Sequence, residues 1–120
     1  MAYDDQNIFA KILRGEIPCT KLYEDDYALA FPDINPHAPV HILVIPKGPY
    51  LSMEDFGSRA TPEEITGFYR AVSAVAQENG LVQDGFRAIA NAGANGGQEV
   101  PHFHVHLLGG KPIGPMVSKS

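Results

Sequence analysis

The sequence contains no tryptophan and only one cysteine, Cys19, among its 120 residues. A single cysteine cannot form an intramolecular disulfide or a Cys-x-x-Cys zinc or redox motif, and this fits a reducing compartment. The longest apolar run, Ile42 to Ile45, is far too short to cross a bilayer. The first residues are acidic and lack the apolar stretch of a signal peptide, so we expect a cytoplasmic protein that does not associate with a membrane.

Positive charge is also scarce. There are 9 Lys and Arg against 14 Asp and Glu, which gives a net charge of −5. Such a chain repels a polyphosphate backbone, which argues against general nucleic-acid binding but leaves a local site for a small phosphate-bearing ligand open. The length and the hydrophobic content of 44% are typical of a globular chain with one core. We therefore expect one domain over residues 1–120.

Local patterns predict two helices and five short strands. Apolar residues at helical spacing over 7–14, with Asn7 as N-cap, predict a short helix. Thr61-Pro62-Glu63-Glu64 is a capping box with proline at the first helical position, and it predicts a long helix to about Asn79. Runs of β-type residues predict strands over 21–24, 27–31, 40–45, 86–91 and about 102–108. These elements predict an α+β domain around a mostly antiparallel sheet.

Three of the five histidines alternate with apolar residues near the C-terminal end: His102, His104 and His106. Successive strand residues point to opposite faces, so we expect the three imidazoles to share one face and the apolar residues to take the other. A polar row is costly to bury without partners, so this face should be open to water or to a ligand. The row indicates a functional site, and an edge strand that merely shows histidines to solvent is the alternative.

Two chemistries suit such a row. Neighbouring histidines on a strand are about 6.7 Å apart, whereas zinc needs its donors about 2 Å away. A metal site would therefore need a further ligand, for which His41 is the obvious candidate. The other chemistry is at phosphorus, where a neutral imidazole is a nucleophile and its neighbours donate hydrogen bonds to phosphate oxygens. The preceding loop, with Asn91, Gly93 and Gly96-Gly97-Gln98, favours this second chemistry because successive backbone N–H groups can form an anion-binding nest.

The segment GQEVPHFHVHLL (97–108) resembles the signature of the histidine triad (HIT) superfamily, His-x-His-x-His followed by apolar residues. Other segments are similar to its Hint branch, the histidine triad nucleotide-binding proteins. These segments are IFAKI (8–12), GEIP (15–18), AFPDINP (30–36), HILVIPK (41–47) and the Gly-Gly pair 109–110. The resemblance covers about residues 7–110 and leaves 111–120 as a C-terminal tail. It implies a HIT-like fold whose five-stranded sheet extends across a homodimer.

The resemblance also implies an activity, that of a purine nucleoside phosphoramidase or related nucleotidyl hydrolase without a cofactor or a resident metal. His104 would attack the α-phosphorus of an AMP or GMP derivative and form a covalent nucleotidyl-histidine that water hydrolyses. His106 would contact the phosphate and protonate or orient the leaving group. His102 would orient the nucleophile through its backbone carbonyl, and His41 would support the triad. The alternatives are a dinucleoside polyphosphate hydrolase and a non-catalytic nucleotide-binding interaction protein.

The nucleotide pocket is implied by the same resemblance. Asp33 would accept the ribose hydroxyls, and Ile34 would contact the base with Phe31 behind it. Asn91 and the stretch Gly97-Gln98-Glu99 would approach the α-phosphate and the leaving group. One position departs from the Hint pattern, which usually has serine or threonine after the loop glutamine, where this chain has Glu99. A carboxylate there opposes a phosphate unless it is protonated or turned away, so this residue bears on leaving-group preference.

Overall fold

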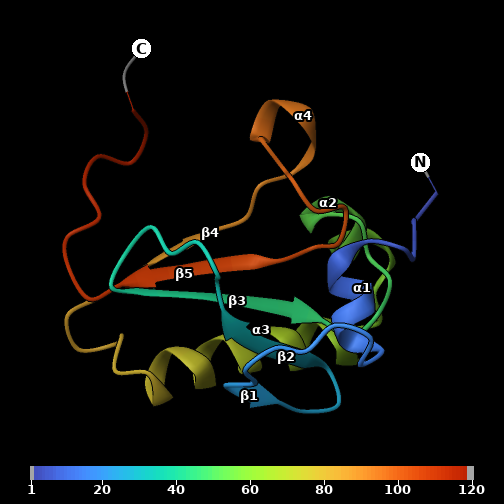
Figure 1. Cartoon of the computed structure of the whole chain (residues 1–120), viewed down its shortest axis with the longest axis horizontal. Coiled ribbons are helices and arrows are strands. Elements are labelled where there is room, and N and C mark those ends of the chain that lie inside the picture. The colour runs from blue at the N-terminus through green and yellow to red at the C-terminus, as the bar shows by residue number, and fades with distance from the viewer. Residues whose placement is uncertain (1, 119–120) are drawn as a thin grey trace.

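The computed structural model describes residues 2–118. Its elements in chain order are α1 (Ile8–Leu13), β1 (Tyr23–Glu24), β2 (Ala28–Pro32), β3 (Val40–Pro46), α2 (Met53–Arg59), α3 (Pro62–Glu78), β4 (Arg87–Ile89), α4 (Gly93–Gly96) and β5 (Val105–Gly109). The strands form one sheet in the order β1-β2-β3-β5-β4, and every neighbouring pair is antiparallel (Figure 1). The α+β prediction with a five-stranded sheet is confirmed.

The sheet separates two hydrophobic clusters. On one face α3 packs against β2 and β3, and its buried side chains Phe68 and Val75 join the larger cluster. On the other face α1 contributes Phe9 and Ile12 to a smaller cluster. Strand residues alternate between the two, as the period of two in a strand requires. The smaller cluster is completed by Leu29, Phe31, Leu43 and Ile45.

Both predicted helices form, and each begins at the expected cap. The side chain of Asn7 accepts a hydrogen bond from the Ala10 N–H at the start of α1. Thr61 and Glu64 bond reciprocally as a capping box at the start of α3. Within residues 2–118, no helix combines the length and the apolar character that spanning a membrane requires.

Two helices were not predicted. α2 has only one buried residue, Phe56, so it lacks the apolar period that marks a helix in sequence. It is stabilised instead by Ser52 as N-cap and by an ion pair between Asp55 and Arg59. α4 is a single turn in the glycine-rich loop.

The last strand is shorter than expected. β5 pairs with β3 only from Val105 onward, opposite Val44. Upstream of that point the backbone bonds elsewhere, because the Phe103 N–H donates to the carbonyl of Tyr50 beyond the end of β3. His102 and His104 therefore lie just before the strand, and only His106 lies within it.

Candidate functional site

The predicted alternation of the histidine row is confirmed. The apolar residues between the histidines, Phe103, Val105 and Leu107, all pack in or against the cluster on the α3 side of the sheet. The expected openness of the histidine face is wrong for two of its members. His102 is 0% exposed and His104 is 6% exposed, and in the described chain every fully buried side-chain N or O atom has a hydrogen-bond partner. Burial costs little here because the polar atoms are bonded.

His102 has a defined tautomer. Its Nε2 lies 3.0 Å from the carbonyl oxygen of Pro46, which only accepts, so Nε2 carries the proton. Its Nδ1 must then accept, and it does so from the hydroxyl of Tyr3 at 2.6 Å. Burial lowers the pKa of His102 to about 4, so this imidazole is neutral near pH 7.

His104 is held through the backbone of His102. Its Nδ1 donates to the carbonyl oxygen of His102 at 2.7 Å, which leaves the lone pair on Nε2. Burial lowers the pKa of His104, although the hydrogen bond to the carbonyl and two nearby carboxylates act in the opposite direction. The ring of Phe9 meets it edge-on, with centroids 5.0 Å apart. A neutral imidazole with a free Nε2 lone pair is a nucleophile.

His106 presents the complementary group. The backbone N–H of His37 donates to Nδ1 of His41 at 3.0 Å, so the proton of His41 is on Nε2. That N–H donates to Nδ1 of His106 at 2.9 Å, and the remaining proton of His106 is therefore on Nε2. Burial, followed by the neighbouring histidines, lowers the pKa of His106 to about 4. The rings of His104 and His106 are 5.0 Å apart between centroids, so the imidazole with the free lone pair and the imidazole with the N–H donor are neighbours.

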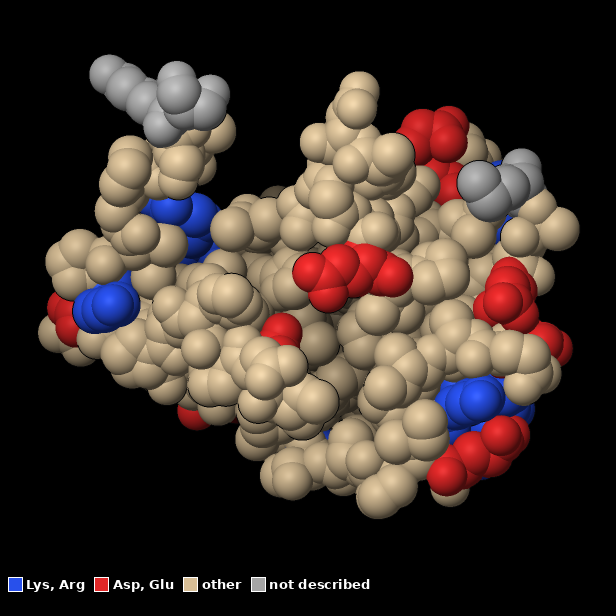
Figure 2. Space-filling model, turned by 45° about the horizontal axis from the view of Figure 1, so that its top comes forward, with Lys and Arg blue, Asp and Glu red and all other residues tan. Residues whose placement is uncertain are grey.

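The charged side chains near these rings are carboxylates. Oδ2 of Asp33 lies 3.4 Å from Nε2 of His41, and the negative charges of Asp33 and Glu99 both act to raise the pKa of His104. Among residues 2–118, the side chains whose charge shifts the pKa of His41, His104 or His106 are Asp33, Glu99 and other histidines. Figure 2 shows acidic side chains near the middle of one face, with Lys and Arg gathered toward its edges. A phosphate in this site would be held by neutral N–H donors.

Asp33, His41 and His106 could also hold a metal ion. Each offers one ligand atom, and these atoms lie within 4.8 Å of one another. Two imidazoles and a carboxylate form a donor set that zinc accepts. The nitrogens of His41 and His106 already share a proton in their hydrogen bond, however, so an ion would compete with that proton for the same atoms.

The nucleotide-pocket residues differ in how far they are exposed. Phe31 is 5% exposed within the smaller cluster, and Ile34 is 88% exposed beside the half-buried Asp33. Asn91 is half-buried, and Glu99 is exposed. The structure thus places an acceptor and an uncovered apolar side chain next to each other, ahead of β3.

Three backbone N–H groups of the glycine-rich loop, where an anion nest was expected, are bonded within the loop. The Gly93 N–H donates to Oε1 of Gln98 at 3.0 Å, and the Gln98 N–H donates back to the Gly93 carbonyl at 3.1 Å. The Gly97 N–H donates to the carbonyl of Ala94. These three N–H groups are used inside the loop, because a turn of helix forms there. The amide of Gln98 also donates to the carbonyl of Leu51, which fixes the loop to the rest of the chain.

No pattern in the sequence indicates that Tyr3 belongs to this site, because it is 99 positions away from His102. Asn7 was predicted only as a helix cap, but its amide also donates to the Tyr3 hydroxyl at 2.9 Å. Neither residue belongs to a recognisable spacing motif, so only the fold brings them to the triad.

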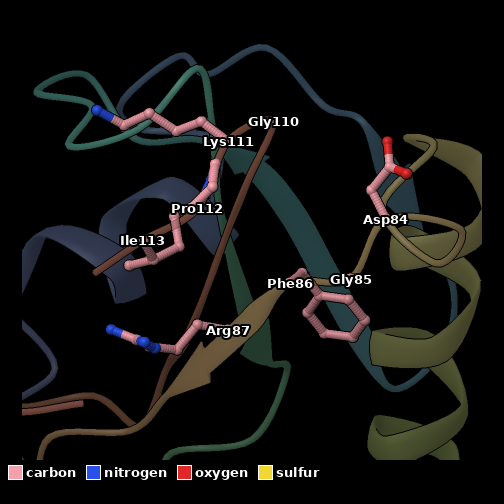
Figure 3. A pocket seen from close by; sticks show the side chains of 8 residues that line it. All are labelled: Asp84, Gly85, Phe86, Arg87, Gly110, Lys111, Pro112 and Ile113. Atoms are coloured by element: carbon pink, nitrogen blue, oxygen red, sulfur yellow. The ribbon is translucent and has the colours of Figure 1, made fainter. Parts of the chain in front are cut away.

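A cavity of about 570 Å³ lies away from the histidines, between the start of β4 and the segment after β5 (Figure 3). Its lining contains none of the predicted site residues. The guanidinium of Arg87 there donates to the carbonyls of Gly114 and Pro115, which holds the C-terminal segment against β4.

Comparison with known proteins places these histidines in a family. Residues 14–113 match the family model of the HIT domain. The chain belongs to the HIT domain family. It is 56% identical to an uncharacterized HIT-like protein of Azospirillum brasilense, over 98% of this chain and 96% of the relative. It is also 45% identical to the purine nucleoside phosphoramidase of Escherichia coli, over 95% of each chain.

Solved structures agree with this assignment. A histidine triad protein from Clostridium difficile superposes with a TM-score of 0.85 at 46% identity, covering 98% of this chain and 100% of that one. A HIT family hydrolase from Legionella pneumophila gives a TM-score of 0.81 at 42% identity, over 88% of this chain and 93% of that one. The predicted family and fold are confirmed, and the relatives include hydrolases.

Proposed function

We propose that this protein is a purine nucleoside phosphoramidase, a nucleotidyl hydrolase that releases AMP or GMP through a covalent intermediate on His104. The observation that carries the proposal is the hydrogen-bonded pattern of tautomers, which leaves the lone pair of His104 on Nε2 and a proton on Nε2 of His106. The 45% identity to a relative named purine nucleoside phosphoramidase supports the substrate class.

The reaction follows from these two atoms. Nε2 of His104 attacks the α-phosphorus, and the bond from phosphorus to the leaving nitrogen breaks. That nitrogen departs as a neutral amine when a proton from solvent water joins it, and the Nε2–H of His106 donates a hydrogen bond that orients the leaving group. Water then attacks phosphorus, the bond to His104 breaks, the nucleoside monophosphate leaves, and one proton of that water returns to solvent.

The electrostatics favour a phosphoramidate over a dinucleoside polyphosphate. The negative charges that act on the pKa of His104 are those of Asp33 and Glu99. A phosphoramidate monoester carries about one negative charge, whereas a polyphosphate bridge carries several and needs cations nearby. Hydrolysis of dinucleoside polyphosphates is therefore the less favoured activity.

The remaining pocket residues take the roles that the family resemblance implies. Asp33 accepts the ribose hydroxyls, and the exposed side chain of Ile34 is free to contact the base in front of Phe31. Asn91 and the stretch Gly97-Gln98-Glu99 line the side where the leaving group departs. The carboxylate of Glu99 is close enough to His104 to act on its pKa. Its negative charge disfavours leaving groups that are themselves negatively charged.

The test is turnover of a fluorogenic adenosine phosphoramidate by the wild type and by His104→Ala. We expect the substitution to lower kcat by at least about 1000-fold, as is usual for loss of a nucleophile. Acid-quenched wild type should show, by mass spectrometry, one nucleotidyl adduct that maps to His104 and is missing from the variant. Thermal melting of both proteins checks that the variant is folded.

Three results would contradict the proposal. If neither the wild type nor His104→Ala hydrolyses the phosphoramidate, although both bind nucleotide, the protein is a nucleotide-binding protein without turnover. Faster hydrolysis of diadenosine polyphosphates than of the phosphoramidate would identify the alternative hydrolase. An adduct on any residue other than His104 would overturn the assignment of the nucleophile.

A further inference from the structure

We propose that the hydroxyl of Tyr3, held by Asn7, is a positioning group for the nucleophile: it fixes the ring of His102, whose carbonyl orients His104. The proposal rests on the function proposed above, because the nucleophile that it positions is His104. Neither Tyr3 nor Asn7 touches the reacting atoms in the proposed reaction, so neither is a catalytic residue.

The direction of each hydrogen bond in this chain is fixed. The amide Nδ2 of Asn7 can only donate, so the Tyr3 oxygen accepts from it at 2.9 Å. The Tyr3 proton is therefore free to donate to Nδ1 of His102 at 2.6 Å, while Nε2 of His102 donates to Pro46. Every donor in the chain meets one acceptor, which leaves a single arrangement.

The hydroxyl matters because His102 is completely buried. Without it, Nδ1 of His102 is an acceptor with no partner in a dry environment, which is costly, and the ring is no longer held from both sides. The carbonyl of the same residue lies 2.7 Å from Nδ1 of His104. A shift of His102 is therefore passed directly to the nucleophile, whose alignment with phosphorus controls the rate.

Asn7 connects this chain to helix α1. Its Oδ1 caps the helix through the N–H of Ala10, and its Nδ2 bonds both Tyr3 and the carbonyl of Asp4. The same helix places Phe9 edge-on against His104. Burial raises the pKa of Tyr3, which keeps its hydroxyl protonated, and so a donor, at neutral pH. The N-terminal segment and α1 are thereby tied to the site at two points, Tyr3 against His102 and Phe9 against His104.

The first experiment compares Tyr3→Phe with Tyr23→Phe. Both remove one tyrosine hydroxyl hydrogen bond, but that of Tyr23 goes to Asp25 beside the edge strand β1. We expect Tyr3→Phe to lower kcat on the phosphoramidate by about tenfold, because a misaligned His104 raises the barrier by about the energy of one hydrogen bond. KM should change less than twofold, and Tyr23→Phe should retain the wild-type kcat. Equal kcat values for the two variants would overturn the proposal.

The second experiment separates positioning from helix capping. Asn7→Ser and Asn7→Asp both keep an oxygen that can cap α1 through Ala10, and both lose the amide that donates to Tyr3; the serine hydroxyl can still donate, whereas the carboxylate can only accept. The carboxylate of Asn7→Asp is a strong acceptor that draws the Tyr3 proton away from His102, whereas the serine hydroxyl competes weakly. We expect a lower kcat in Asn7→Asp than in Asn7→Ser at similar melting temperature. A lower kcat in Asn7→Ser, or identical values, would contradict the proposed direction of the chain.

A readout without catalysis distinguishes the two proposals. In wild type, ¹⁵N NMR of the histidine rings should show the proton of His104 on Nδ1, and Tyr3→Phe should broaden or shift this signal while Tyr23→Phe leaves it unchanged. If the wild type shows this coupling but no turnover, the proposed function fails and the positioning contact stands. If turnover occurs and the ¹⁵N signal of His104 is the same in Tyr3→Phe as in wild type, only the positioning role fails.

Discussion

A neutral imidazole has one donor nitrogen and one acceptor nitrogen, and the partner of one decides the role of the other. Backbone groups make that choice for three rings of this site: the Pro46 carbonyl for His102, the His102 carbonyl for His104 and the His37 N–H for His41. His106 inherits its tautomer from His41. Because backbone groups are set by the fold, the same side chains would have no fixed roles in an unfolded loop.

The activity should persist into mildly acidic solution. An imidazolium has no lone pair at Nε2, so protonation of His104 stops the attack. Burial lowers the pKa of His104 below its ordinary value of 6.5, so protonation is delayed to lower pH. We expect the acid limb of kcat/KM for the phosphoramidate to have its midpoint below pH 6.5. A midpoint at or above 6.5, or a rate that stays flat down to pH 3 in protein that remains folded, would contradict this.

The stability of the fold should also decrease in acidic solution, as the pH falls below 6.5. The pKa of His102 is about 4 when folded and 6.5 when unfolded, so the unfolded chain binds more protons between these values. The free energy of unfolding should therefore decrease as the pH falls from 6.5 to 4, by about 3 kcal/mol at most from this residue. Urea unfolding at several pH values measures the slope, and His102→Gln, which cannot titrate, should reduce it. An unchanged slope in the variant would show that other groups dominate.

At the scale of elements, what the sequence predicts depends on how local the signals are. The capping box at Thr61 spans only a few residues, and so does the alternation of histidines with apolar residues that ends at Leu107. Both were predicted correctly. The helix α2 was missed because it buries only Phe56, and the start of β5 was placed too early because Phe103 bonds to Tyr50, which is remote in sequence.

The same difference between local patterns and long-range contacts explains which residues of the site were predicted. The histidine row and His41 were found from spacing and resemblance, because each lies in a short segment with a clear local pattern. The contact of Tyr3 with His102 and the closure of the glycine-rich loop by Gln98 depend on where the chain returns in space. No local pattern encodes such contacts, so they required the fold.

A pair of glycines tests packing on helix α3. A Cβ on Gly67 would lie 2.3 Å from a ring atom of Tyr27, whereas a Cβ on Gly57 in α2 meets nothing within 4 Å. Helix propensity alone favours alanine at both positions by about 1 kcal/mol. We expect Gly57→Ala to stabilise the protein by up to that amount and Gly67→Ala to destabilise it by about 1–3 kcal/mol. Urea unfolding measures both, and equal stability of the two variants would show that Tyr27 moves aside freely.

At the scale of the whole molecule, the strand order leaves β4 at one edge of the sheet. A strand edge with backbone groups on its free side is a template for pairing with another chain. β4 is short, and its middle residue Ala88 is exposed, as are Ile65 and Tyr69 on α3 at 37% and 76%. An edge strand with free backbone groups, together with uncovered apolar side chains, suits association of two copies better than exposure to water.

We therefore expect a homodimer in which the two sheets meet along β4. Light scattering during size-exclusion chromatography should give twice the 13.0 kDa mass of the chain. Ala88→Glu would place one carboxylate from each copy at a two-fold contact, where like charges repel, and should shift the mass to that of one chain. Ser58→Glu, on α2, adds the same charge without altering the β4 edge and should leave the dimer intact. A wild type that elutes as one chain would refute the dimer, and a dimer unaffected by Ala88→Glu would move its interface away from β4.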